Sequence, residues 1–176
     1  MKKLQLLTYI CALIVAGVYF LFTLSFSSGW AIGQMFGEFY TEAQIANRAM
    51  FDVAKWAIIF AFLGIVFQSH KNRNFFLSNY VLSAASVATM IISGLTTLKY
   101  MEPLKIMYLD INEEILDLIS QVNYSNIGTH MFELGTYLSF LLFVQAAWVL
   151  VFTILKFRQN LIRAKAKKLA KVEVSL

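Results

Sequence analysis

A short charged stretch precedes one of the long apolar runs of the sequence. Gln44, Arg48, Asp52 and Lys55 lie at i, i+4, i+8 and i+11, so on a helix they share one face. Arg48 can pair with Asp52, and Asp52 with Lys55. Ionisable groups at membrane depth are candidate substrate or ion sites. The alternative is an interfacial charge cluster that ties this helix to a neighbouring helix or loop.

The sequence offers little other chemistry. The two histidines, His70 and His130, fall on opposite sides of the expected membrane, which argues against a paired-histidine haem site, and the single Cys11 excludes dithiol redox chemistry. No phosphate-binding glycine loop and no Cys/His cluster occurs. His130 and Glu133, one helical turn apart, favour a hydrogen bond at a helix start over a metal site. We therefore expect no enzymatic activity and no cofactor.

The composition indicates that these residues belong to a membrane protein. Of 176 residues, 59% are hydrophobic and 14% are charged, whereas soluble domains are about 25% charged. A helix needs about 20 apolar residues to cross a membrane. Four segments qualify, at about residues 4–26, 50–68, 75–98 and 134–155. We predict an all-α integral membrane protein, with residues 1–176 forming one antiparallel bundle of four transmembrane helices.

The basic residues predict the orientation of this bundle. Lys2 and Lys3 precede the first span, and Lys71 and Arg73 separate the second from the third. Seven more follow the fourth span: Lys156, Arg158, Arg163, Lys165, Lys167, Lys168 and Lys171. Because cytoplasmic loops are enriched in Lys and Arg, we expect a plasma-membrane protein with both termini in the cytoplasm. The net charge of +5 then reports topology and does not indicate nucleic-acid binding.

The opposite, outer side is acidic. Pro103 suits the first turn of a helix, and apolar residues then recur at helical spacing, which predicts an amphipathic outer helix at about 103–121. Its polar face carries candidate partner-docking acids: Asp110, Glu113, Glu114 and Asp117. The apolar stripe of this helix could instead cap the protein's own outer face. Nearby, Thr41 and Gln44 have the spacing of a capping box, so we expect the second helix to begin at Thr41.

Small and hydroxylated residues predict how the helices meet. On the third span they recur with a period near that of a helix: Asn79, Ser83, Ser86, Met90, Ser93 and Thr97. Compatible small residues on the first and fourth spans are Ala12, Ala16, Gly135, Ser139, Ala146 and Thr153. Such residues let membrane helices approach closely and exchange hydrogen bonds. A polar pathway is the alternative, although hydroxyls without charges form a poor ion route.

Residues 156–176 predict a basic helical tail. It either continues the fourth span into the cytoplasm or bends onto the inner membrane surface. Candidate contacts to anionic lipids are Lys156, Arg158, Arg163, Lys165, Lys167 and Lys168. A cytoplasmic binding partner and a purely solvated tail are the other two interpretations.

Together these features favour a non-enzymatic accessory or scaffold subunit of a larger membrane protein complex. Its expected partners are the lipid bilayer and another membrane protein or a further copy of itself. The alternative is a small transporter or channel subunit that acts as a homo-oligomer, with a polar site around Arg48, Asp52 and Lys55.

Overall fold

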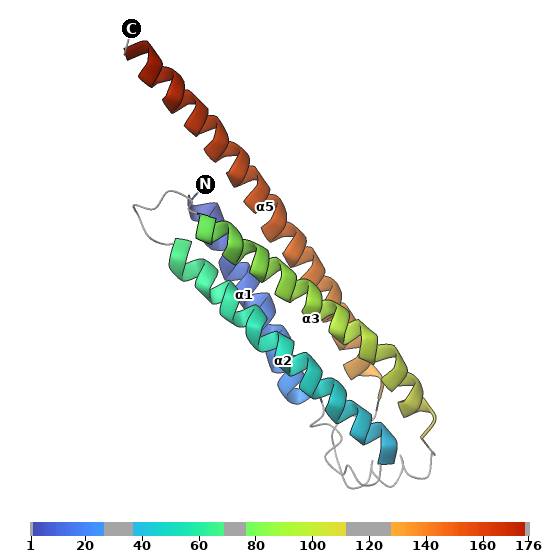
Figure 1. The fold of residues 1–176 in the computed structure, drawn as a ribbon. Helices are drawn as coiled ribbons and strands as arrows, with labels where there is room; N and C mark the ends of the chain where they lie inside the picture. The colour runs from blue at the N-terminus through green and yellow to red at the C-terminus, as the bar shows by residue number, and fades with distance from the viewer. Residues whose placement is uncertain (1, 27–36, 69–76, 112–127, 175–176) are drawn as a thin grey trace.

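The computed structural model describes residues 2–26, 37–68, 77–111 and 128–174. These residues form helices α1 (Lys2–Ser25), α2 (Gly37–Gln68), α3 (Leu77–Leu109) and α5 (His130–Val174), which lie alongside one another in an elongated bundle (Figure 1). All four helices are long and apolar enough to cross a membrane. For the described residues, the prediction of a helical fold with four helices of membrane-spanning length is therefore confirmed.

The helices pack in a closed cycle of neighbours, in which α1 contacts α2, α2 contacts α3, α3 contacts α5, and α5 returns to α1. We call the end of the bundle that holds the N-terminus the proximal end. At the opposite, distal end, α2 and α5 begin and α3 finishes (Figure 1). At the proximal end α5 extends well beyond the other three helices (Figure 1).

Three helices are longer than a bilayer requires. With 32, 33 and 45 residues, α2, α3 and α5 measure about 48, 50 and 68 Å at about 1.5 Å per residue. The hydrocarbon layer is only about 30 Å thick. Each of these three helices is therefore longer than an upright membrane span needs.

The start of α2 differs from the prediction. The helix begins at Gly37, whose φ of 53° is the left-handed conformation that glycine adopts without strain. Thr41 therefore lies inside the first turns, where its hydroxyl reaches back to the Gly37 carbonyl at 3.5 Å. The predicted capping box at Thr41 is wrong, because the glycine starts the helix one turn earlier.

The end of α3 also differs. A separate helix was predicted to start at Pro103, but α3 runs through this proline to Leu109. Proline removes one backbone hydrogen bond from a helix interior. Here Met101, Leu104 and Tyr108 on either side of it are buried, so packing holds the helix together across the gap. The rest of the predicted outer helix, with Glu113, Glu114 and Asp117, lies outside the described residues.

The predicted packing seam is confirmed. On α3 its residues are all buried: Asn79, Ser83, Ser86, Met90, Ser93 and Thr97. On α1, Ala12 and Ala16 have no exposed surface, and the same holds for Ser139 on α5. Glycines allow the closest contacts, since a β-carbon at Gly64 would overlap the ring of Tyr9. A β-carbon at Gly135 would likewise lie 2.5 Å from the Met101 sulfur.

Candidate functional site

The three charged residues singled out in the sequence share one face of α2. We call them the α2 charge stripe: Arg48, Asp52 and Lys55. Lys55 Nζ lies 2.5 Å from Asp52 Oδ1, and the two side chains are 42% and 56% exposed. Arg48 is exposed as well. The stripe therefore faces away from the bundle interior.

The apolar length of α2 indicates the depth at which the stripe would lie in a membrane. Counting about 20 residues back from Gln68 puts the distal membrane boundary near Arg48. Asp52 and Lys55 are then about one and two helical turns inside it. Exposed apolar residues surround them, among them Ile45, Trp56 and Ile59.

The corresponding surfaces of the other helices are apolar. The apolar stretches 4–25, 79–98 and 134–155 contain no Asp, Glu, Lys, Arg or His. Their exposed side chains include Ile14 and Leu21 on α1, Ile92 on α3, and Phe140 and Val144 on α5. Within the described spans, only α2 presents charge to its surroundings at this depth.

The interior is polar but uncharged. None of the buried side chains that the structure describes is an acid, a base or a histidine. Instead two tyrosines of α1 hydrogen-bond to the α3 seam. The Tyr9 and Ser83 hydroxyls lie 2.5 Å apart, and those of Tyr19 and Thr97 lie 2.7 Å apart. We call these two contacts the hydroxyl seam.

The tyrosines were missed from the sequence, although a signal was present. Tyr9, Ala12, Ala16 and Tyr19 follow helical spacing, and all four are buried on one face of α1. An aromatic hydroxyl on a small-residue face of a membrane helix needs a polar partner. The hydroxyls along α3 were the available partners.

A second polar group joins α1 to α5 nearer the proximal end. Gln145 Nε2 donates to the Thr8 carbonyl, and Trp148 Nε1 donates to the Thr8 hydroxyl, each at 3.2 Å. Lys156, a predicted lipid contact, donates to the side chain of Gln5. The first basic residue of the tail therefore also holds the bundle together.

Aromatic rings close the distal end. Phe26, Phe39, Tyr108 and Phe132 come from the ends of α1, α2, α3 and α5 and are all at most 3% exposed. The Phe132 ring centroid lies 5.8 Å from that of Tyr108 and 6.2 Å from that of Phe26. Phe39 lies 5.5 Å from Tyr108. This distal aromatic cluster fills the bundle axis with side chains.

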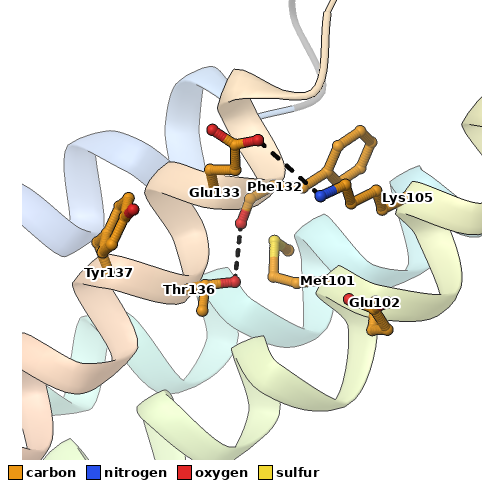
Figure 2. A pocket seen from close by; sticks show the side chains of 7 residues that line it. All are labelled: Met101, Glu102, Lys105, Phe132, Glu133, Thr136 and Tyr137. Carbon is orange, nitrogen blue, oxygen red and sulfur yellow. Dashed lines mark hydrogen bonds and ion pairs between the residues drawn. The ribbon is translucent and has the colours of Figure 1, made fainter.

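A pocket of about 230 Å³ lies beside the cluster, between α3 and α5 (Figure 2). Its lining residues are Met101, Glu102, Lys105, Phe132, Glu133, Thr136 and Tyr137. Lys105 Nζ lies 3.9 Å from Glu133 Oε1 across the pocket. We call this the distal pocket. The sequence did not predict it, because Lys105 comes to lie beside α5 only when α3 continues through Pro103.

Glu133 makes further contacts at the start of α5. The Thr129 hydroxyl donates to Glu133 Oε1 at 3.1 Å, whereas His130 Nδ1 lies 3.9 Å from Oε2 and its side chain is 94% exposed. The predicted hydrogen bond at this helix start therefore comes from Thr129 and not from His130. Within the described ranges, no group of three or more His, Cys, Asp or Glu residues could hold a metal ion.

The basic tail is part of α5, which continues unbroken to Val174. Arg158, Arg163 and Lys165 are exposed, and Lys167 and Lys168 belong to the same helix. Of the predicted docking acids, the structure describes Asp110, which is exposed just after α3. Its amide donates to the Ile106 carbonyl at 3.1 Å.

The structure thus brings Arg48, Asp52 and Lys55 onto one exposed face of α2. Separately, it brings Glu102 and Lys105 of α3 next to Glu133 of α5 in the distal pocket. Comparison with other proteins adds no further assignment: no protein family model, no curated protein and no solved structure matches this chain.

Proposed function

We propose that this chain is a non-enzymatic accessory or scaffold subunit of a larger membrane protein complex. In this proposal the four helices form an antiparallel bundle in the plasma membrane, with both termini in the cytoplasm. One observation carries the proposal: charge at membrane depth is turned outward on α2, whereas the buried side chains described are neutral. A subunit that works through its contacts needs its polar groups on the surface.

The exposed pair of Asp52 and Lys55 supports a protein contact at this surface. Charged groups that face lipid are costly, and they are rare unless they pair with each other or with another protein. Asp52 is paired with Lys55, which leaves the stripe with the positive charge of Arg48. A partner helix with one acidic residue at the depth of Arg48 would neutralise it.

A second copy fits this surface less well. Copies in one membrane share one orientation, so a symmetric pair would bring each residue to the depth of its own counterpart. Arg48 would then face Arg48, and Asp52 would face Asp52. Like charges placed opposite each other destabilise an interface. We therefore favour a different membrane protein as the partner of the α2 charge stripe.

The ends of the chain supply the remaining proposed contacts. The tail starts at the proximal end, and the excess of basic residues there supports our proposal that this end faces the cytoplasm. Lys156 lies near the membrane boundary, whereas Lys168, twelve residues further along α5, stands about 18 Å beyond it if the helix is upright. Attraction to lipid headgroups fades over about 10 Å. We propose that Lys156 and Arg158 contact anionic lipid, and that the end of the tail reaches a cytoplasmic partner.

The distal end would then face outward. The exposed Asp110 begins the acidic surface that we propose for partner docking, together with Glu113, Glu114 and Asp117. Replacing these four acids with amides should disturb assembly of the complex. Unchanged assembly would rule out a docking role for this segment.

The proposal is tested by purification from the native membrane at native abundance. In mild detergent the wild-type chain, of 20.1 kDa, should run in a larger complex whose other components mass spectrometry identifies. Replacing Arg48, Asp52 and Lys55 with alanine should release the chain from it. Glu38→Gln is the matched control, because Glu38 is exposed on α2 outside the expected membrane span. Recovery of the wild-type chain alone would contradict the proposal.

The alternative is a transporter or channel subunit that acts as a homo-oligomer. The ionisable pair of Asp52 and Lys55 at membrane depth is the observation that favours it. The distal aromatic cluster argues that any route would run between copies and not through the bundle axis. Ion or solute flux into liposomes, lost in Asp52→Ala or Lys55→Ala, would support this alternative.

A further inference from the structure

We propose that the distal pocket binds a phospholipid headgroup that carries both a phosphate and a primary amine. This inference is independent of the proposed function. It concerns a lipid held at the surface between α3 and α5, whatever complex the chain joins.

The depth of the pocket suits a headgroup. About 20 residues of α3 from Asn79 reach Leu98, where the hydrocarbon layer ends. Glu102 then lies about one turn further along α3. On α5 the apolar run starts at Leu134, directly after Glu133. The charged wall of the pocket thus stands at the level of lipid headgroups.

The charges of the pocket select the chemistry of its occupant. Glu102 and Lys105 of α3 and Glu133 of α5 line it, which gives two carboxylates and one ammonium group (Figure 2). Lys105 and Glu133 are only partly exposed, at 33% and 46%, and their 3.9 Å separation is longer than a hydrogen bond. Both groups therefore keep hydrogen-bonding capacity toward an occupant of the pocket. A phosphate would bind Lys105, and an ammonium group would bind the carboxylates.

A zwitterionic headgroup with a primary amine fits the distal pocket better than an anionic or a trimethylated headgroup does. A purely anionic headgroup would satisfy Lys105 but leave both carboxylates facing negative charge. A trimethylated amine would bring positive charge without N–H donors, so it could not form charge-assisted hydrogen bonds to Glu102 or Glu133. A primary ammonium group supplies both the charge and the donors.

Apolar side chains beside the pocket can contact the acyl chains of a bound lipid. Met101 and Phe132, at 2% and 1% exposure, close its floor. Tyr137, 70% exposed, stands on its membrane side, at the level where tyrosines concentrate in membrane proteins. The exposed Phe140 and Leu141 continue from Tyr137 down α5. Acyl chains below a bound headgroup would lie against these side chains.

Lipid retention measured by native mass spectrometry tests the proposal. The full chain is reconstituted in nanodiscs of equal parts phosphatidylethanolamine, phosphatidylcholine and phosphatidylglycerol and released into mild detergent. The wild type should retain phosphatidylethanolamine over phosphatidylcholine by about tenfold, the value of one charge-assisted hydrogen bond. Equal retention of all three lipids, or a preference for phosphatidylglycerol, would overturn the proposal.

Variants assign the recognition to particular residues. Glu102→Gln with Glu133→Gln should abolish the preference for the primary amine, and Lys105→Met should lower retention of every phospholipid. Lys99→Met is the matched control, because Lys99 is exposed on α3 outside the pocket and should leave the pattern unchanged. A preference for the primary amine that persists without the two carboxylates would overturn the proposal, and so would unchanged lipid retention in Lys105→Met. If one variant fails to fold, the other decides alone. Soluble phosphoethanolamine bound without any lipid would overturn the lipid assignment.

Discussion

The hydroxyl seam and the α2 charge stripe use polar groups in opposite ways. At the seam, Tyr9 and Tyr19 of α1 and Ser83 and Thr97 of α3 are neutral, buried and hydrogen-bonded to one another. On the stripe, by contrast, Asp52 and Lys55 are charged, exposed and paired only within their own helix. The hydroxyls of the seam find their hydrogen-bond partners within one chain. The charged groups of the stripe remain on the surface, where a neighbouring protein can contact them.

The difference follows from the cost of removing each kind of group from water. A hydroxyl needs one or two hydrogen bonds, which a neighbouring helix supplies. A charge needs an opposite charge as well as hydrogen bonds, and it remains costly inside a membrane protein. A chain that keeps its described interior neutral can pack tightly, while its charged surface directs association. The comparison therefore separates residues that stabilise the fold from residues that form contacts.

The largest expected effect comes from breaking the close packing beside the seam. Gly64→Val would push side-chain carbons into the ring of Tyr9. Overpacking of this kind costs about 1–3 kcal/mol and sometimes more. We expect a clear loss of thermal stability in detergent, or of folded protein. Gly17→Val is the matched control, because a β-carbon at Gly17 meets no atom within 4 Å. Equal effects of the two substitutions would contradict the packing described for α1 and α2.

A smaller effect is expected when one tyrosine hydroxyl of the seam is removed. Tyr19→Phe deletes the hydroxyl that lies 2.7 Å from the Thr97 hydroxyl and donates to the Ser93 carbonyl at 3.3 Å. Hydrogen bonds between membrane helices contribute about 0.6 kcal/mol on average and at most about 1.7. Unfolding measured in detergent should show a loss in this range. The control is Tyr137→Phe, since Tyr137 is 70% exposed and its change should leave stability unaltered.

The smallest effect on the isolated chain is expected at the stripe. Asp52→Asn together with Lys55→Gln removes an exposed ion pair that lies within one helix, so the contacts between helices should persist. The melting temperature of the purified chain in detergent should not change, although assembly into the complex should weaken. A marked loss of stability in the isolated chain would show that the stripe serves the fold, and the contrast with the seam would disappear.

Sequence patterns were sufficient for the spans and for the small-residue face of α3. Both depend on local features, namely apolar runs of membrane length and residues that recur with the helical period. The position of Asp52 and Lys55 on one face of α2 also follows from spacing alone. These features need no knowledge of the neighbouring helices.

The distal pocket and the partners of Tyr9 and Tyr19 could not be obtained in this way. A proline such as Pro103 favours a first helical turn over a helix interior. Burial of Leu104 and Tyr108 nevertheless accompanies the interior position seen in α3. That burial comes from residues distant in the sequence, among them Phe39 and Phe132. When α3 continues through the proline, Lys105 lies beside Glu133 of α5, and the distal pocket forms between the two helices.

The central claim is that the exposed face of α2 contacts protein, whereas the exposed faces of the other helices contact lipid. A photo-crosslinking amino acid in place of Trp56 on α2, expressed at native abundance, tests it most directly. The same group in place of Phe140 on α5 is the control, because the two side chains are similarly exposed, at 49% and 57%. We predict a protein adduct from position 56 and only lipid adducts from position 140. Lipid adducts alone from both positions would contradict the account.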